Sequence, residues 1–268
     1  MAAPFQGVGV ALVTLFDDHG DVLVDATAEH ARSLVDLGMR HVLVCGSTGE
    51  AGSLTPDERV ALIGAVRRSL PRGVPVLAGT GAASAAAAAE LTVAAREAGA
   101  DAILALSPPG SEQLVRYYAA VVGAAGGLPV LAYHFPAMSA PGIELEVLPS
   151  LPVAGVKDSS GDPERLAAEV DGWDGSVFVG STRILHLARA LGAAGAILGL
   201  ANAEPEICLA AFDGDAAAET ALAASRRREA ELGFPVGVKQ LTARRFGVSP
   251  VARLERGGSP PATARIAT

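Results

Sequence analysis

Short apolar runs alternate with longer segments of helical periodicity from the first residues to about residue 200. A continuous apolar run of about four to eight residues is typical of a strand buried on both faces, whereas apolar positions three or four residues apart indicate an amphipathic helix. The pattern predicts eight strands, at residues 8–14, 41–45, 74–78, 102–106, 130–133, 153–157, 177–179 and 194–198. Seven helices are expected between them, at residues 26–37, 56–69, 83–98, 111–125, 145–151, 163–170 and 182–190.

Strands separated by helices form parallel sheets, and eight such units close into a barrel. The sequence therefore predicts an α/β protein with a (β/α)8 TIM barrel. The strand runs stop after residue 200, and further helices are expected from residue 202, at 216–232 and at 237–246. We interpret these helices as a C-terminal addition to a single domain over residues 1–268, with the barrel in 1–200 and the helical extension in 201–268. Residues 257–268 are expected to be loosely ordered.

Local signals at the helix ends agree with this alternation. Thr55 and Pro56 are an N-cap residue and a proline at the first helical position. Gly38, Gly99 and Gly192 each follow a helical segment, where glycine commonly ends a helix. These signals favour helices that begin and end where the apolar pattern changes.

Composition and charge exclude several classes of function. The net charge is -8 and the isoelectric point about 5.1, which argue against nucleic-acid binding. The run of three arginines at residues 226–228 is expected to lie on a solvated helix face. The N-terminal residues lack the cationic start of a signal peptide, and no apolar run reaches membrane-spanning length, so we expect a cytoplasmic protein. Cys45 and Cys208 are far apart in sequence and are expected to be buried, reduced thiols.

The most informative residue for chemistry is Lys157, at the C-terminal end of the sixth predicted strand. TIM barrels carry their active sites at this end of the strands. Only Lys157 and Lys239 are lysines among 21 basic residues, although a general bias toward arginine would produce the same rarity. A lysine with its pKa lowered by burial to roughly 7 to 8 is a nucleophile that forms a Schiff base with a ketone.

Two further strand ends offer groups that could act with this lysine. The loop from Gly46 to Glu50 contains Ser47 and Thr48, whose hydroxyls and backbone N–H groups suit a carboxylate, although a plain glycine–serine turn is the alternative. Glu50 is expected to be either an acid at a helix N-terminus or a hydrogen-bond acceptor of the loop, and not a catalyst. Tyr133 ends the fifth strand and is a candidate proton donor, the alternative being a tyrosine that only closes the core. Because strand residues alternate in direction, the tyrosine and the histidine after it cannot both face the barrel interior.

The eighth strand ends at residues 197–202, where Gly199 allows the backbone to approach a bound substrate closely. Other chemistries have less support. The five histidines show no HxH or HExxH spacing, so no metal site is expected. No GxGxxG dinucleotide motif follows a strand. Cys45 is expected to be a core residue.

Four motifs in this order carry a family resemblance: GSTGE at residues 46–50, the tyrosine of the fifth strand, GVKDSSGD at residues 155–162, and GLAN at residues 199–202. Over about residues 7–250 the chain resembles the N-acetylneuraminate lyase and dihydrodipicolinate synthase superfamily. The resemblance implies a class I aldolase that forms a Schiff base with pyruvate, assembles as a dimer or tetramer, and uses neither a metal nor an organic cofactor.

The resemblance also implies roles for individual residues. Lys157 would be the Schiff-base lysine and Tyr133 the general acid and base. Ser47 and Thr48 would hold the pyruvyl carboxylate, and Ile197 would contribute backbone contacts near the bound keto acid. The expected partner is a small molecule, either a 2-oxo acid or pyruvate with an aldehyde.

Two departures from the dihydrodipicolinate synthases argue against that activity. Their Pro-Tyr-Tyr motif, whose second tyrosine completes a proton relay, is replaced by residues 108–110, Pro-Pro-Gly. Their arginine for the carboxylate of the aldehyde is replaced by Met138. The small and apolar residues Pro109, Gly110, Ala137 and Met138 suggest a less charged acceptor.

Three hypotheses follow. The first is a lyase that cleaves or forms a carbon–carbon bond between pyruvate and an aldehyde. The second is 4-hydroxy-tetrahydrodipicolinate synthase. The third is a barrel that binds keto acids without catalysis, and the missing relay tyrosine motivates it.

Overall fold

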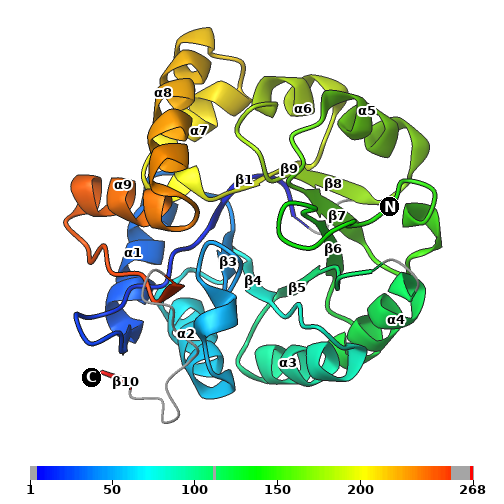
Figure 1. The fold of residues 1–268 in the computed structure, drawn as a ribbon, viewed down its shortest axis with the longest axis horizontal. Helices are drawn as coiled ribbons and strands as arrows, with labels where there is room; N and C mark the ends of the chain where they lie inside the picture. The colour runs from blue at the N-terminus through cyan, green and yellow to red at the C-terminus, as the bar shows by residue number, and fades with distance from the viewer. Residues whose placement is uncertain (1–4, 111–112, 255–265, 268) are drawn as a thin grey trace.

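The computed structural model describes residues 5–110, 113–254 and 266–267. Within this part of the chain, eight parallel strands close into a barrel, and pairing of the last strand with the first closes it (Figure 1). The predicted TIM barrel is therefore confirmed, with strand ends shifted by a few residues. The strands are β1 (Gly7–Ala11), β3 (Val42–Val44), β4 (Val76–Gly79), β5 (Ala102–Leu106), β6 (Val130–His134), β7 (Gly155–Asp158), β8 (Ser176–Val179) and β9 (Gly195–Leu198).

Helices surround the barrel as expected, with one exception. They are α1 (Val24–Asp36), α2 (Pro56–Ser69), α3 (Ala85–Glu97), α4 (Leu114–Ala125), α5 (Pro163–Gly172) and α6 (Leu185–Leu191). The helix expected at residues 145–151 is wrong, because this stretch forms only the 3-10 turn η2 (Leu148–Ser150). Pro149 lies inside it, and proline cannot donate the hydrogen bond that a longer helix needs there. Residues 111 and 112 of the predicted fourth helix lie outside the described residues.

Three helices follow the last strand: α7 (Pro205–Phe212), α8 (Ala216–Leu232) and α9 (Val236–Phe246). α7 packs against α6 and β1, so it occupies the place of the eighth barrel helix, although the sequence pattern had grouped it with the C-terminal addition. α8 packs on α7 and α9, outside this ring (Figure 1). Two short strands, β2 (Val22–Leu23) and β10 (Ile266–Ala267), form a small separate sheet. The other residues of the 257–268 prediction lie outside the described part.

The residues expected to begin and end the helices have these roles in the structure. Thr55 forms a capping box with Glu58, in which each side chain accepts a hydrogen bond from the backbone N–H of the other residue. Gly38, Gly99 and Gly192 follow α1, α3 and α6 with φ of 108°, 98° and 89°, a left-handed backbone that favours glycine. No helix in the described ranges is long and apolar enough to cross a membrane.

Two layers of apolar packing position the site. The larger cluster lies between the outer faces of the strands and the helices. The smaller one fills the barrel interior with residues that alternate along the strands, among them Leu131, Tyr133, Phe178 and Ile197. This interior packing supports the strand ends where the candidate site lies.

Candidate active site

Lys157 lies near the end of β7, between Tyr133 on β6 and Phe178 on β8 in the strand register. Its side chain is only 4% exposed. Burial lowers the pKa of the Lys157 amine to about 7, because removal from water disfavours the charged form. At neutral pH a large fraction of this amine is therefore unprotonated and able to attack a carbonyl carbon.

Tyr133 is the immediate neighbour of this amine. The Lys157 Nζ lies 4.3 Å from the centroid of the Tyr133 ring. Burial raises the pKa of the Tyr133 phenol to about 12, with hydrogen bonds from the hydroxyls of Ser159 and Ser47 opposing the increase. The phenol is thus protonated at neutral pH and can donate a proton. His134 faces away from the interior, where its Nδ1 accepts a hydrogen bond from the Ile143 N–H at 2.9 Å.

The loop that follows β3, residues 46–50, is held in a strained conformation next to the lysine. Cys45 and Glu50 bracket the loop, and both have φ of 56°, a left-handed value that is costly for residues other than glycine. The Thr14 hydroxyl donates to the Gly49 carbonyl at 2.8 Å. Glu50 accepts a hydrogen bond from the Leu254 N–H at 2.9 Å. These contacts hold the end of the loop that carries Thr48. Of the two roles expected of Glu50, the structure shows the hydrogen-bond acceptor, with its donor in the C-terminal segment.

A cavity of about 560 Å³ opens above Lys157. Its inner part contains Thr48, Tyr133, Ser159 and Gly199 beside the lysine. This volume is within the range of pockets that bind small organic ligands. The arrangement brings together a nucleophilic amine, a proton donor and hydroxyl groups at the C-terminal face of the barrel.

Two predicted residues lie elsewhere. Ser47 does not line this cavity; it lines a smaller hollow of about 300 Å³ that also has Tyr133 in its wall. Ile197 is fully buried in the barrel interior and does not line the cavity either. The substrate-binding roles of both residues stay predictions.

Gly180 explains how the lysine and its neighbours pack so closely. A Cβ atom on Gly180 would lie 1.8 Å from the Ser159 Oγ and 2.9 Å from the Lys157 Cε. Sequence reasoning missed both Gly180 and Ser159, although Ser159 stands two residues after the lysine in the motif. The Ser159 hydroxyl donates to the Tyr133 hydroxyl at 3.3 Å.

The GLAN motif has one residue at the cavity and one that supports the loop. Gly199 lines the cavity, and a Cβ there would lie 3.3 Å from the Thr48 Oγ1. Asn202 is completely buried and bridges to the end of β1 and the residues after it, where it accepts from the Val13 N–H at 3.0 Å and donates to the Ala11 carbonyl at 2.7 Å. Asn202 therefore fixes the position of the loop that presents Gly199.

The outer part of the cavity holds charged residues that the sequence did not indicate. Arg183 follows β8, and Arg226 and Glu229 come from α8. The arginine run was expected on a solvated face, and this is correct for Arg227 and Arg228 but wrong for Arg226, which is half-buried in the cavity wall. The sequence could not identify it, because the choice among three consecutive arginines depends on how α8 packs on the barrel.

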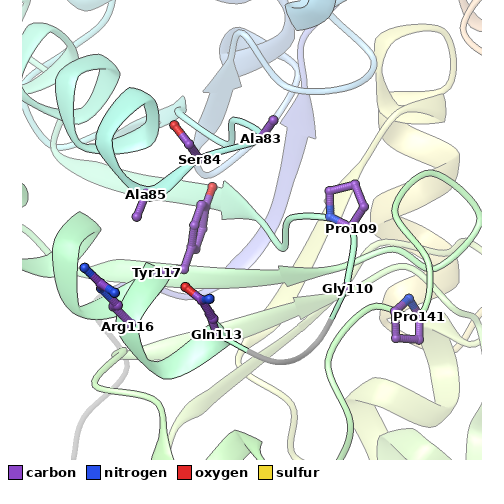
Figure 2. Close-up of a pocket in the computed structure, with 9 residues that line it drawn as sticks. All are labelled: Ala83, Ser84, Ala85, Pro109, Gly110, Gln113, Arg116, Tyr117 and Pro141. Carbon is purple, nitrogen blue, oxygen red and sulfur yellow. The ribbon is translucent and has the colours of Figure 1, made fainter.

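A larger cleft, of about 750 Å³, lies outside the barrel next to α3 and α4 (Figure 2). Its lining residues include Ser84, Pro109, Gly110 and Tyr117, and it shares none with the Lys157 cavity. The Tyr117 hydroxyl is occupied by backbone partners, since it accepts from the Ala82 N–H at 3.1 Å and shares its single proton between the Ala82 and Leu106 carbonyls, each at 3.2 Å. The Ser84 hydroxyl caps α3 by accepting from the Ala87 N–H, and no lysine, cysteine or histidine lines the cleft among the described residues, so the candidate site stays at Lys157.

Charged residues also lie behind the lysine. Arg165 bridges Asp158 at 3.1 Å and Glu169 at 2.9 Å, and both carboxylates are buried. Burial, together with the charge of Asp158, raises the pKa of Glu169 to about 8. This cluster ties α5 to the residue that follows Lys157 and so holds the end of β7 in place.

The thiols and possible metal ligands give no second site. Cys45 and Cys208 are free and buried, as expected, and burial raises the pKa of the Cys45 thiol to about 12. Within the described ranges, no group of three or more histidine, cysteine, aspartate or glutamate residues is arranged to hold a metal ion.

Comparisons with known proteins agree with the four motifs. The Dihydrodipicolinate synthetase family model matches residues 4–232. The 4-hydroxy-tetrahydrodipicolinate synthase of Synechococcus sp. strain CC9605 is 36% identical over 233 residues, covering 82% of this chain and 77% of that protein. An uncharacterized DapA-like lyase of Halobacterium salinarum is 34% identical over 218 residues, covering 78% of this chain and 71% of that protein.

Solved structures agree over nearly the whole chain. The dihydrodipicolinate synthase of Aquifex aeolicus superimposes with a TM-score of 0.85 at 27% identity, covering 94% of this chain and 92% of that one. YagE from E. coli K12, a prophage protein of the dihydrodipicolinic acid synthase family solved with pyruvate, gives a TM-score of 0.82 at 26% identity, with 97% and 93% covered. The chain therefore belongs to the dihydrodipicolinate synthetase family of lyases.

Proposed function

We propose that this protein is a class I aldolase in which Lys157 forms a Schiff base with pyruvate or a related 2-oxo acid. The observation that carries the proposal is the buried Lys157 amine, with its pKa lowered to about 7, beside the Tyr133 phenol at the C-terminal face of the barrel. An unprotonated amine adds to the ketone carbon to give a carbinolamine, and loss of water gives the imine.

The neighbouring groups support each later step. Loss of a proton from the methyl carbon of the imine gives an enamine, whose carbon attacks the aldehyde carbon to form the new bond. The aldehyde oxygen takes up a proton, and water then hydrolyses the imine to release product and free Lys157. Tyr133 is the proton carrier in this scheme, and its hydrogen-bonded neighbours Ser159 and Ser47 offer a path for the proton. Thr48 and the N–H groups at the start of its loop would hold the pyruvyl carboxylate, because the Gly49 and Glu50 N–H groups already donate to the Gly46 and Ser47 carbonyls.

Reductive trapping tests the proposal. Pyruvate with borohydride should attach a reduced pyruvyl group to Lys157, which peptide mass mapping identifies without ambiguity because Lys239 is the only other lysine. A Lys157→Arg variant keeps a cation but cannot form the imine, and it should remain unmodified. Recovery of an unmodified Lys157 peptide from the natural protein would refute the proposal.

A second candidate is 4-hydroxy-tetrahydrodipicolinate synthase, which is the name of several curated relatives. Met138 stands where such synthases carry an arginine, and it is half exposed beside the Ser47 hollow, outside the Lys157 cavity. Coupled turnover with pyruvate and aspartate semialdehyde separates the two candidates, and we expect it to be slow. Cytoplasmic location and assembly into dimers or tetramers remain predictions from the sequence.

A further inference from the structure

The outer wall of the Lys157 cavity is built by two segments that are remote in sequence. One is the loop after β8, with Ser181, Thr182 and Arg183, and the other is α8, with Arg226 and Glu229. This loop begins at Gly180, where a side chain would collide with Ser159 and crowd Lys157. A reactant bound at the lysine and extending outward therefore meets this wall.

Arg226 is fixed in the wall. Its Nη1 donates to the Thr182 carbonyl at 3.0 Å and lies 3.5 Å from the Thr182 Oγ1. These contacts join α8 to the loop after β8 and hold the half-buried guanidinium at the cavity. Arg183 is exposed and lines the same cavity.

The two guanidinium groups are not neutralised by a close acid, although Glu219 and Glu229 lie within electrostatic range of Arg226. Burial and the charge of Arg183 lower the pKa of Arg226, with Glu219 and Glu229 opposing the shift. Burial raises the pKa of Glu229, and this weakens its negative charge. Among the residues that the structure describes, neither arginine forms a salt bridge. An anion placed between two such cations would relieve their repulsion and accept charge-assisted hydrogen bonds from both.

The small and apolar loop residues that suggested a less charged acceptor do not decide the charge of the substrate, because most of them lie outside the Lys157 cavity. Pro109 and Gly110 line the outer cleft of Figure 2, and Met138 lines the Ser47 hollow. Only Ala137 of that set lines the Lys157 cavity. The charge of the substrate must therefore be inferred from Arg183 and Arg226.

We propose that Arg183 and Arg226 bind an anionic group, a carboxylate or a phosphate, at the end of the substrate remote from the pyruvyl unit. The inference rests on the proposed function, because it assumes that the pyruvyl unit is attached to Lys157. The preferred acceptors are aldehydes that carry a carboxylate or phosphate. Arg226, anchored on Thr182, sets the position of this group, and Arg183 completes its contacts.

The test compares 2-oxo acids of equal length by trapping at Lys157, so that no turnover is needed. 2-Oxoglutarate, 2-oxoadipate and 2-oxopimelate carry a terminal carboxylate, whereas 2-oxopentanoate, 2-oxohexanoate and 2-oxoheptanoate do not. We expect half-saturation at concentrations about 10-fold to 100-fold lower for the dicarboxylate of at least one length, since a hydrogen bond to a charged group contributes about 1.5–3 kcal/mol. Arg226→Gln and Arg183→Gln should each remove most of this preference, measured as the ratio of the half-saturating concentrations of the charged and uncharged acids of equal length.

Arg227→Gln is the matched control, because Arg227 is the exposed neighbour on α8, and it should keep the full preference. Equal half-saturation for each pair of acids, or the same loss for charged and uncharged acids in Arg226→Gln, would overturn the inference. Absence of any adduct, even with pyruvate, would instead refute the proposed function. With pyruvate as donor, glyceraldehyde 3-phosphate and succinic semialdehyde then decide whether a phosphate or a carboxylate is preferred.

Discussion

Glu50 and Lys239 form an ion pair in which both side chains are fully buried. Lys239 also donates to the Val251 carbonyl at 2.6 Å and lies 4.1 Å from the centroid of the Phe16 ring. Because Glu50 ends the loop that contains Thr48, the pair joins α9 to the candidate carboxylate-binding loop. Helix α9 therefore supports the site through the loop after β3, whereas Lys157 itself lies on β7.

Removing one member of this pair should be strongly destabilising. Lys239→Met leaves the Glu50 carboxylate buried without its cation, and such a loss costs about 3–5 kcal/mol. We expect the free energy of unfolding in urea to fall by about this amount. In the control, Lys239→Met combined with Glu50→Gln should recover part of the stability, because no buried charge is then left alone. If Lys239→Met alone lowered the free energy of unfolding by less than about 1 kcal/mol, the pair would contribute no more than an exposed salt bridge does, and this prediction would be wrong.

Schiff-base formation should depend on pH through Lys157. The protonated amine cannot attack a carbonyl, and burial lowers the pKa of Lys157 to about 7. The rate of trapping should therefore rise about tenfold per pH unit below this pKa and level off above it. Cyanoborohydride trapping followed by mass spectrometry measures the profile. A rate that still climbs steeply toward the ordinary lysine pKa of about 10.4 would contradict a buried nucleophile.

Gly180 should not tolerate a methyl group. In Gly180→Ala the new Cβ would overlap the Ser159 Oγ and crowd the Lys157 Cε, so both groups must move. Misplacement of a reacting group by about 1 Å costs on the order of 100-fold in rate, and we expect trapping of pyruvate to slow by about 10-fold to 100-fold. Gly172→Ala is the matched control, because no heavy atom lies within 4 Å of the added Cβ, and its trapping rate should equal that of the natural protein.

Tyr133→Phe tests the proton carrier. The ring and its contact with Lys157 remain, but the hydroxyl that accepts from Ser159 is lost. General acid and base catalysis contributes about 10²–10⁴ in rate, so imine formation and turnover should slow by at least about 100-fold. The concentration of pyruvate that half-saturates trapping should change little. Tyr117→Phe is the control, because it removes a tyrosine hydroxyl from the cleft of Figure 2, and it should leave the rates unaltered. Equal rates in Tyr133→Phe and the natural protein would exclude Tyr133 from proton transfer.

Much of the fold follows from local patterns. The eight apolar runs became the eight strands, and α2 and α8 span the residues expected for them. The helix expected at residues 145–151 failed because its apolar spacing was outweighed by Pro149. α7 was separated from the barrel in the sequence pattern, yet its packing on α6 and β1 places it in the helical ring. Such packing depends on contacts between distant segments, which periodicity does not describe.

The sequence by itself determined that a lysine and a tyrosine end neighbouring strands of a parallel barrel, because strand periodicity and turn residues act over short distances. Only the tertiary structure decided which groups surround them. The burial that lowers the pKa of Lys157 and the close contact with Gly180 depend on several strands meeting at one end of the barrel. The packing of α8 likewise selects Arg226 from three consecutive arginines. Burial and charge at the site are properties of segments that are remote in the chain and adjacent only after folding.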